Sequence, residues 1–164
     1  KVEGTGALGL FIVQPRVGRG EGEVNIRKFR SMTGDDKGNE TLLTKHKVTK
    51  VGRILRVTRL DEFAQLWSVL LGEFSLIGPR PEFATLVSEY NKAVPYYNIR
   101  HLVQPGITGW AQILHQGHPH HGVDREATKA KLAYDLYYIK NRSFVLDLKI
   151  ALKTAGTLFS RVGA

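Results

Sequence analysis

The segment RLDEFAQLWSVLLGEFSLIGPRPE, residues 59–82, constrains the fold most, because it joins a helical pattern to an abrupt stop. Its apolar side chains recur with helical spacing at positions 60, 63, 66, 67, 70 and 71. Gly72 follows, where a glycine commonly ends a helix. The segment therefore predicts a helix from Leu60 to about position 71, with Asp61 and Glu62 in its first turn.

Two glycine-rich stretches and a polar one predict turns and loops. Apolar or alternating runs at 8–13 and 24–29 flank GRGEGE, which is typical of a β-hairpin. The polar stretch from Thr33 to Lys50 predicts a surface loop, and QPGITG predicts another turn.

Three further helices are predicted around proline and capping residues. One follows GPRP, with Pro81 in its first turn, and ends before Pro95. Two more run from Asp124 to about 140 and from Ser143 to about 159, with these residues as N-caps. Together the elements predict one α+β domain, residues 1–164, that is mostly helical with an N-terminal β-hairpin.

The last predicted helix is amphipathic. Its apolar side comprises Phe144, Leu148, Ala151, Leu152, Ala155, Leu158 and Phe159. Lysines lie mostly on the other side, so the pattern fits either core packing or a helix lying in a membrane interface.

The composition favours an anionic partner. The 24 Lys and Arg against 15 Asp and Glu give a formal charge of +9. This excess suits nucleic acid, a lipid headgroup surface or a phosphorylated small molecule, although a merely soluble basic surface would also carry it. The chain has no cysteine, which excludes disulfides, thiolate metal sites and a cysteine nucleophile.

Asp61 and Glu62 are the candidate reactive groups. Neighbouring helical residues point about 100° apart, so both can line the rim of one cleft but cannot be buried alike. A helix N-terminus favours their ionised forms, which could attack phosphorus or hold a divalent metal. The ordinary explanation is that Thr58 is the N-cap and the acids only complement the helix end.

Basic residues around this pair favour a phosphoryl-transfer site. Arg53, Arg56 and Arg59 precede the acids, and Arg80 follows between Pro79 and Pro81, whose rings would fix its direction. Lys28 and Arg30 of KFRSM would extend the same basic wall from a strand. The alternative is a solvated basic face with weak ion pairs.

The histidines form no convincing metal site. The Gly/Pro-containing segment HQGHPHHG carries His115, His118, His120 and His121, but no matching distal ligand is present. A solvent-exposed loop is the favoured interpretation.

Four blocks carry a family resemblance. These are KFRSM, the 59–82 segment, RHLVQPGITGWAQI and YDLYYIKNRSFVLDLKIALKT. In the same order they resemble the signature blocks of bacterial sugar transferases, the monotopic polyprenyl-phosphate glycosylphosphotransferases, from about Val13 to about Thr154. The resemblance implies transfer of a sugar 1-phosphate from a UDP-sugar to polyprenyl phosphate, giving polyprenyl diphosphate sugar and UMP. That reaction begins exopolysaccharide, O-antigen, capsule or glycoprotein glycan assembly.

The resemblance also implies residue roles. Asp61 would be the nucleophile of a phosphoaspartyl intermediate, and Glu62 would help hold Mg²⁺. Arg56 and Arg80 would bind phosphate groups, and Lys28 and Arg30 would also contact the substrate.

The chain departs from the family pattern at a few positions. Where the family usually has Leu-Pro after the acid pair and Asn further on, this chain has Phe63, Ala64 and Ser68. We interpret these positions as structural. No apolar stretch reaches the roughly 20 residues of a membrane-crossing helix, so we expect the family's N-terminal membrane helix to lie outside this chain. We expect a fragment, starting at Lys1, of a longer enzyme on the cytoplasmic face of the inner membrane.

Two other functional classes compete with the enzyme. A nucleic-acid-binding module could use the basic surface with Trp67, Trp110 and the tyrosines as stacking groups. It would not explain the acids beside the arginines, so no nucleic-acid partner is expected. A catalytically silent membrane-surface domain is the other alternative. The sugar and the oligomeric state stay open.

Overall fold

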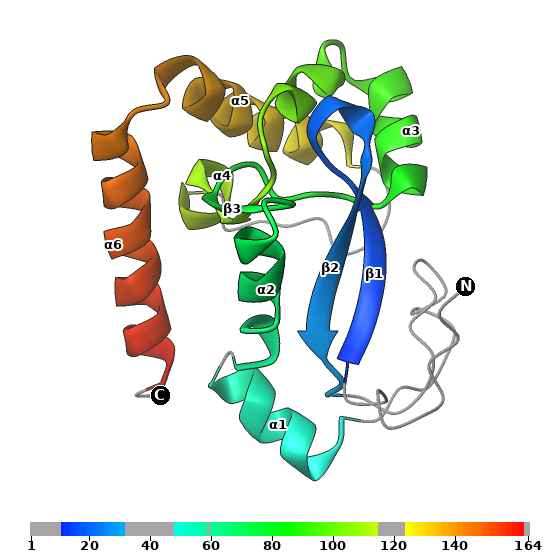
Figure 1. Cartoon of the computed structure of the whole chain (residues 1–164). Coiled ribbons are helices and arrows are strands. Elements are labelled where there is room, and N and C mark those ends of the chain that lie inside the picture. The colour runs from blue at the N-terminus through cyan, green and yellow to red at the C-terminus, as the bar shows by residue number, and fades with distance from the viewer. Residues whose placement is uncertain (1–10, 32–47, 59, 115–123, 163–164) are drawn as a thin grey trace.

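The N-terminal part of the chain forms the predicted β-hairpin. The structure, a computed structural model, describes residues 11–31, 48–58, 60–114 and 124–162. Strands β1 (Phe11–Val17) and β2 (Glu23–Phe29) pair antiparallel, with the short 3₁₀ turn η1 (Arg19–Glu21) between them (Figure 1). The first strand continues past the predicted end at position 13.

Helix α1 (Lys50–Val57) is an element that the sequence did not predict. Thr49 is its N-cap, and the Thr49 hydroxyl accepts a 2.8 Å hydrogen bond from the Gly52 amide. Most of the predicted 33–50 loop lies outside the described residues, but Lys50 is already helical. Val51, Ile54 and Leu55 recur with helical spacing, so the signal was present in the sequence, but the helix has only eight residues.

The predicted helix at 60–71 is wrong in its first part. A 3₁₀ turn, η3 (Leu60–Glu62), carries both acids, and the α-helix α2 (Gln65–Leu70) begins only afterwards. The Thr58 N-cap is also wrong, because Thr58 ends α1 and its hydroxyl donates to the Ile54 carbonyl at 2.8 Å. The glycine stop is confirmed: Gly72 adopts a φ of 74°, which favours glycine.

A short parallel strand pair lies in the middle of the molecule. Strand β3 (Ser75–Ile77) pairs with β4 (Gly106–Thr108), where the sequence predicted only a turn. A Cβ at Gly106 would collide with the Gly78 backbone, so the absence of a side chain permits this close approach. The pair brings residues 78–82, which we call the GPRPE loop, beside residues 105–109.

Helix α3 (Ala84–Ala93) starts later than predicted. Phe83 is its N-cap, so Pro81 lies before the helix and not in its first turn. The end before Pro95 is confirmed, and the 3₁₀ segment η4 (Tyr97–Leu102) and helix α4 (Trp110–Leu114) follow.

Both C-terminal helices are confirmed with their caps. Helix α5 (Arg125–Asn141) starts after Asp124, whose carboxylate accepts hydrogen bonds from two backbone amides at 3.0 Å. In α6 (Phe144–Val162), the Ser143 hydroxyl accepts from the Leu146 amide at 3.3 Å. Figure 1 shows α5 across one end of the molecule and α6 along its side.

The main core lies between α3, η4 and α5. It consists of Val87, Tyr90, Val94, Tyr97 and Leu132. The molecule is thus mostly helical with an antiparallel strand pair, as expected. Within the described ranges, no helix is both long and apolar enough to cross a bilayer.

Helix α6 contacts the rest of the protein through polar residues and through the apolar Ile150. Ile150 is fully buried, while the Thr154 hydroxyl lies 2.9 Å from that of Thr108 and Asp147 accepts from the Tyr138 hydroxyl at 2.9 Å. The larger apolar side chains stay exposed: Phe144 81%, Val145 74%, Leu152 66% and Leu148 48%. Core packing therefore does not explain Phe144, Leu148 and Leu152 of the predicted apolar side, while the side chains of Leu158 and Phe159 lie outside the described residues.

Candidate active site

Four of the predicted residues meet at one place, which we call the site cluster: Lys28, Asp61, Glu62 and Arg80. Lys28 comes from β2, the acids from η3, and Arg80 from the loop after β3. The Glu62 Oε1 atom lies 3.6 Å from the Lys28 ammonium and 3.9 Å from the Arg80 guanidinium. Both separations are longer than a hydrogen bond, so the two cations are held near the carboxylate without closing on it.

Asp61 holds the most unusual atom of the cluster. Its Oδ1 is shielded from solvent and has no hydrogen-bond partner in the part of the chain that the structure describes. Leaving a buried polar atom unpaired costs roughly 1–3 kcal/mol, and more when the group is charged. Such an oxygen is suited to take up a partner that binds later, such as a phosphorus centre or a cation.

Lys28 is tuned by its surroundings. Burial lowers the pKa of Lys28 below its ordinary value of 10.5, and the positive charge of Arg80 lowers it further. The carboxylates of Glu62 and Asp61 act in the opposite direction, which places both acids within electrostatic reach of the ammonium. An additional anion at this place would be attracted by Lys28 and Arg80 together.

Arg56 lies on α1, and Arg30 lies just after β2. The Arg56 guanidinium donates to the Ser31 hydroxyl at 2.9 Å, and the Thr49 amide donates to the Ser31 carbonyl at 3.1 Å. Arg30 lies half-buried between the end of β2 and Ser31. Ser31 thus connects α1 to the hairpin, while phosphate binding by Arg56 and Arg30 stays a prediction. Arg53 is exposed, and Arg59 lies outside the described residues.

The GPRPE loop has a fixed backbone. The Pro79 carbonyl accepts from the Gly106 amide at 3.0 Å, and the Gly78 amide donates to the Thr108 carbonyl at 2.9 Å. Both Pro79 and Pro81 are buried. The loop is therefore anchored to β4 on one side of Arg80, as its prolines suggested.

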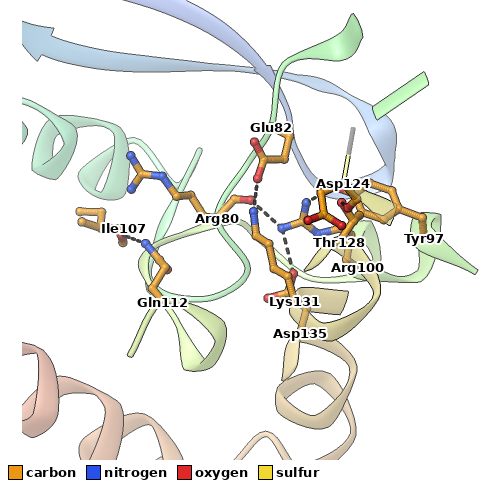
Figure 2. Close-up of polar contacts among 10 residues, drawn as sticks. All are labelled: Arg80, Glu82, Tyr97, Arg100, Ile107, Gln112, Asp124, Thr128, Lys131 and Asp135. Atoms are coloured by element: carbon orange, nitrogen blue, oxygen red, sulfur yellow. Dashed lines mark hydrogen bonds and ion pairs between the residues drawn. The ribbon is translucent and has the colours of Figure 1, made fainter. Parts of the chain in front are cut away.

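A buried pair behind the loop was not predicted. Arg100 in η4 is 2% exposed, forms an ion pair with Asp135 of α5 at 2.9 Å and donates to the Arg80 carbonyl at 2.7 Å. Figure 2 shows this carbonyl facing Arg100 while the Arg80 side chain extends the opposite way. The available signal was an acid inside the aromatic and apolar run YDLYYI, where a charge needs a buried partner.

A second unpredicted arginine joins the hairpin to α2. Arg27 donates to the Ser68 hydroxyl at 2.7 Å and to Glu73 at 2.6 Å, and Ser68 in turn donates to the Asn25 carbonyl at 3.3 Å. Ser68 is fully buried, so its structural interpretation is confirmed. Phe63 is 58% exposed and has no comparable packing role.

The donor set suits a magnesium ion only together with a ligand. Mg²⁺ is usually bound by one or two carboxylates plus substrate phosphates and water. Glu62 and the unpaired Oδ1 of Asp61 fit that pattern. The described ranges contain no group of three or more histidine, aspartate or glutamate side chains able to hold a metal. The predicted histidine segment, residues 115–121, lies outside the described residues.

Known proteins resemble the chain over its whole length. The family described as Bacterial sugar transferase matches residues 1–161. The UDP-N-acetylgalactosamine-undecaprenyl-phosphate N-acetylgalactosaminephosphotransferase of Aeromonas hydrophila is 40% identical over 100% of the chain and 38% of its own length. The UDP-glucose:undecaprenyl-phosphate glucose-1-phosphate transferase of Klebsiella pneumoniae is 41% identical over 86% of the chain and 30% of its own length.

The corresponding glucose-1-phosphate transferase of Escherichia coli (strain K12) is 38% identical over 86% of the chain. The chain spans about a third of the length of these curated relatives.

Proposed function

Since this chain belongs to the bacterial sugar transferase family, we propose that it transfers a sugar 1-phosphate from a UDP-sugar to polyprenyl phosphate. The products are polyprenyl diphosphate sugar and UMP. The names of its relatives support the two substrates, and one of them is an exopolysaccharide production protein of Rhizobium leguminosarum. The observation that carries the proposal is the buried, unpaired Asp61 Oδ1, next in sequence to Glu62, which Lys28 and Arg80 flank.

The proposed reaction has two displacements at phosphorus. An oxygen of Asp61 attacks the phosphorus that bears the sugar, and the bond from that phosphorus to the UMP oxygen breaks with its electron pair. An oxygen of polyprenyl phosphate then attacks the phosphoaspartyl phosphorus and releases the Asp61 carboxylate. No proton transfer to a base is required, because both nucleophiles are anions.

The cations of the site cluster compensate the charge of the phosphates. Lys28 and Arg80 flank Glu62 from two elements, so a bound diphosphate would meet positive charge on two sides. Arg56 and Arg30 extend this wall in our proposal, each as a phosphate ligand. Glu62 would be a protein ligand for Mg²⁺, and the ion would neutralise phosphate oxygens.

We further propose that α6 lies in the membrane interface, on the cytoplasmic face of the inner membrane. Its exposed apolar residues support this location, and so do Lys149 and Lys153. These lysines lie 5.4 Å and 6.0 Å from the centre of the Trp110 ring, itself stacked on Tyr137. Lysines beside amphipathic aromatic rings are typical of a surface that contacts anionic lipid headgroups.

Substitution of Asp61 tests the covalent mechanism. We expect Asp61→Asn to lower the rate of UMP release from UDP-sugars at least about a thousandfold, because an amide is a poor nucleophile. Asp124→Asn is the matched control: it makes the same chemical change at an N-cap where asparagine serves equally well, so its rate should stay unchanged.

The intermediate itself is also observable. Without polyprenyl phosphate, UDP-sugar labelled in the sugar-bearing phosphate should leave label on the wild-type protein and on Asp124→Asn, but not on Asp61→Asn. Undiminished UMP release by Asp61→Asn would refute the phosphoaspartyl step. If the complete gene product releases UMP from no sugar nucleotide, the catalytically silent membrane-surface alternative replaces the enzyme.

A further inference from the structure

We propose that Arg100 and Asp135 are positioning residues that set the direction of Arg80 through its backbone carbonyl. The inference rests on the proposed role of Arg80 as a phosphate ligand. Both residues lie behind the GPRPE loop, and among the described contacts Arg100 meets the site cluster at the Arg80 backbone carbonyl.

The contacts of Arg100 use the planar shape of its guanidinium. One terminal nitrogen donates to the Tyr97 hydroxyl at 2.5 Å. The other donates to the Arg80 carbonyl at 2.7 Å and lies 2.9 Å from an Asp135 carboxylate oxygen. A fixed fork makes these contacts in set directions, whereas a lysine ammonium is a single point on a flexible chain.

Arg100 remains charged in its buried place, although burial raises the pKa of its partner Asp135. Burial opposes the charge of Arg100, but the Asp135 carboxylate, the Tyr97 oxygen and Glu82 outweigh this effect and raise the pKa of Arg100. A charged donor makes a stronger hydrogen bond to a carbonyl than a neutral one. The Arg80 carbonyl is thus held by a donor that does not titrate in the physiological range.

Helix α5 reaches the loop at a second point. One turn before Asp135, Lys131 forms a short ion pair with Glu82, and the Glu82 carbonyl accepts from the Val17 amide at 2.9 Å. With Pro79 bound to Gly106, the loop is fixed on both sides of Arg80. The Arg80 carbonyl, placed between two prolines, is therefore the point where a shift of Arg100 would turn the Arg80 side chain.

Core stability alone is a weak explanation for this pair. Removing two charges from water is costly, and buried ion pairs are often replaced by apolar residues without loss of stability. The hydrogen bond from Arg100 to the backbone of Arg80, a proposed phosphate ligand, gives a functional reason for burying this pair.

A double-mutant cycle tests the inference in the complete gene product. We expect Arg100→Lys to lower kcat/KM for UMP release roughly 10- to 100-fold, because a misplacement of about 1 Å in an active site costs that much. In an Arg80→Ala background the same change should cost no more than about twofold, since nothing is left to position. Thermal unfolding of each variant records its stability separately.

Thr128→Val is the control for a general loss of packing. Thr128 is buried on α5, 3% exposed, and its hydroxyl donates to the Asp124 carbonyl. Its effect on kcat/KM should be small and equal in both backgrounds. If Arg100→Lys does not fold, Tyr97→Phe takes its place. It removes the hydroxyl that orients Arg100 and should cost roughly 3- to 10-fold, again only while Arg80 is present.

The outcomes separate this inference from the proposed function. An equal loss in both backgrounds, or no loss from Arg100→Lys in a folded protein, refutes the positioning role and leaves that of Arg80 intact. If Arg80→Ala itself keeps the wild-type kcat/KM, both Arg80 as a phosphate ligand and the positioning inference fail. The role of Asp61 is decided independently by its own variant.

Discussion

His101, next to Arg100, shows how strongly burial can change the pKa of a single side chain. Its side chain is buried, and neither ring nitrogen has a hydrogen-bond partner among the described residues. Burial lowers the pKa of His101 from 6.5 to about 4, and the neighbouring Arg100 charge adds to the effect. The imidazole is therefore mostly neutral in the folded protein well above pH 4, although the Glu21 carboxylate lies 4.0 Å from its Nδ1 atom.

This residue predicts part of the acid sensitivity of the fold. Between pH 6.5 and 4 the unfolded chain binds a proton at position 101 that the folded protein does not, so stability falls as the pH decreases. We expect His101→Leu to remove up to about 3 kcal/mol of that fall, measured by denaturant unfolding from pH 8 to 4. Thr128→Val should change the free energy of unfolding by the same amount at every pH, because a threonine hydroxyl does not titrate between pH 4 and 8. Parallel curves for wild type and His101→Leu would contradict the assignment.

The residues of the site were only partly predictable. Asp61, Glu62, Arg80 and Lys28 could be found because reactive charges cluster in short, recognisable blocks. Arg100 could not, since its function depends on a carbonyl 20 positions away along the chain. Arg56 was predicted as a phosphate ligand, but nothing in the sequence indicated that Ser31 would hold it.

At the scale of elements, local signals were reliable and long-range ones were not. Helices α5 and α6 have strong caps, and both were predicted to within a few residues at each end. Strands β3 and β4 have three residues each and pair across a long separation, so no periodicity marks them. The sequence placed the acids in a helix because the apolar spacing continues through positions 60–62. In the structure these positions form η3, a separate 3₁₀ turn between α1 and α2.

Helix α1 depends on a glycine at its contact with the hairpin. A Cβ at Gly52 would collide with the Ser31 backbone, whereas Gly156 in α6 has open space around it. We expect Gly52→Ala to destabilise the fold by about 1–3 kcal/mol and to lower activity, because α1 must move away from Ser31 with Arg56. Gly156→Ala should stabilise by about 0.5–1 kcal/mol, from helix propensity alone. Denaturant unfolding measures both changes, and equal effects would show that the Ser31 contact is unimportant.

At the scale of the whole molecule, two surfaces have different chemistry. The site cluster is charged and connects β2, η3 and the GPRPE loop, while the exposed side of α6 is apolar beside lysines. The +9 charge acts on both, since it attracts phosphorylated substrates and anionic lipids alike. The sequence predicted the apolar side of α6 but fitted both core packing and a membrane interface. The exposure of these residues in the structure favours a surface over a core.

The proposed membrane contact of α6 leads to a matched pair of variants. Leu152 on α6 and Leu102 on η4 are almost equally exposed, at 66% and 65%. We expect Leu152→Ser to reduce the binding of the 164-residue chain to phosphatidylcholine–phosphatidylglycerol vesicles roughly 10- to 100-fold, because withdrawing a leucine from lipid costs about 1.5–3 kcal/mol. Leu102→Ser should change binding less than about twofold, since η4 lies outside the proposed contact. Co-flotation measures both, and added salt should weaken wild-type binding by screening the lysines. Equal losses from the two variants would exclude α6 as the membrane-facing element, because the effect would then follow total exposed apolar area and not its position.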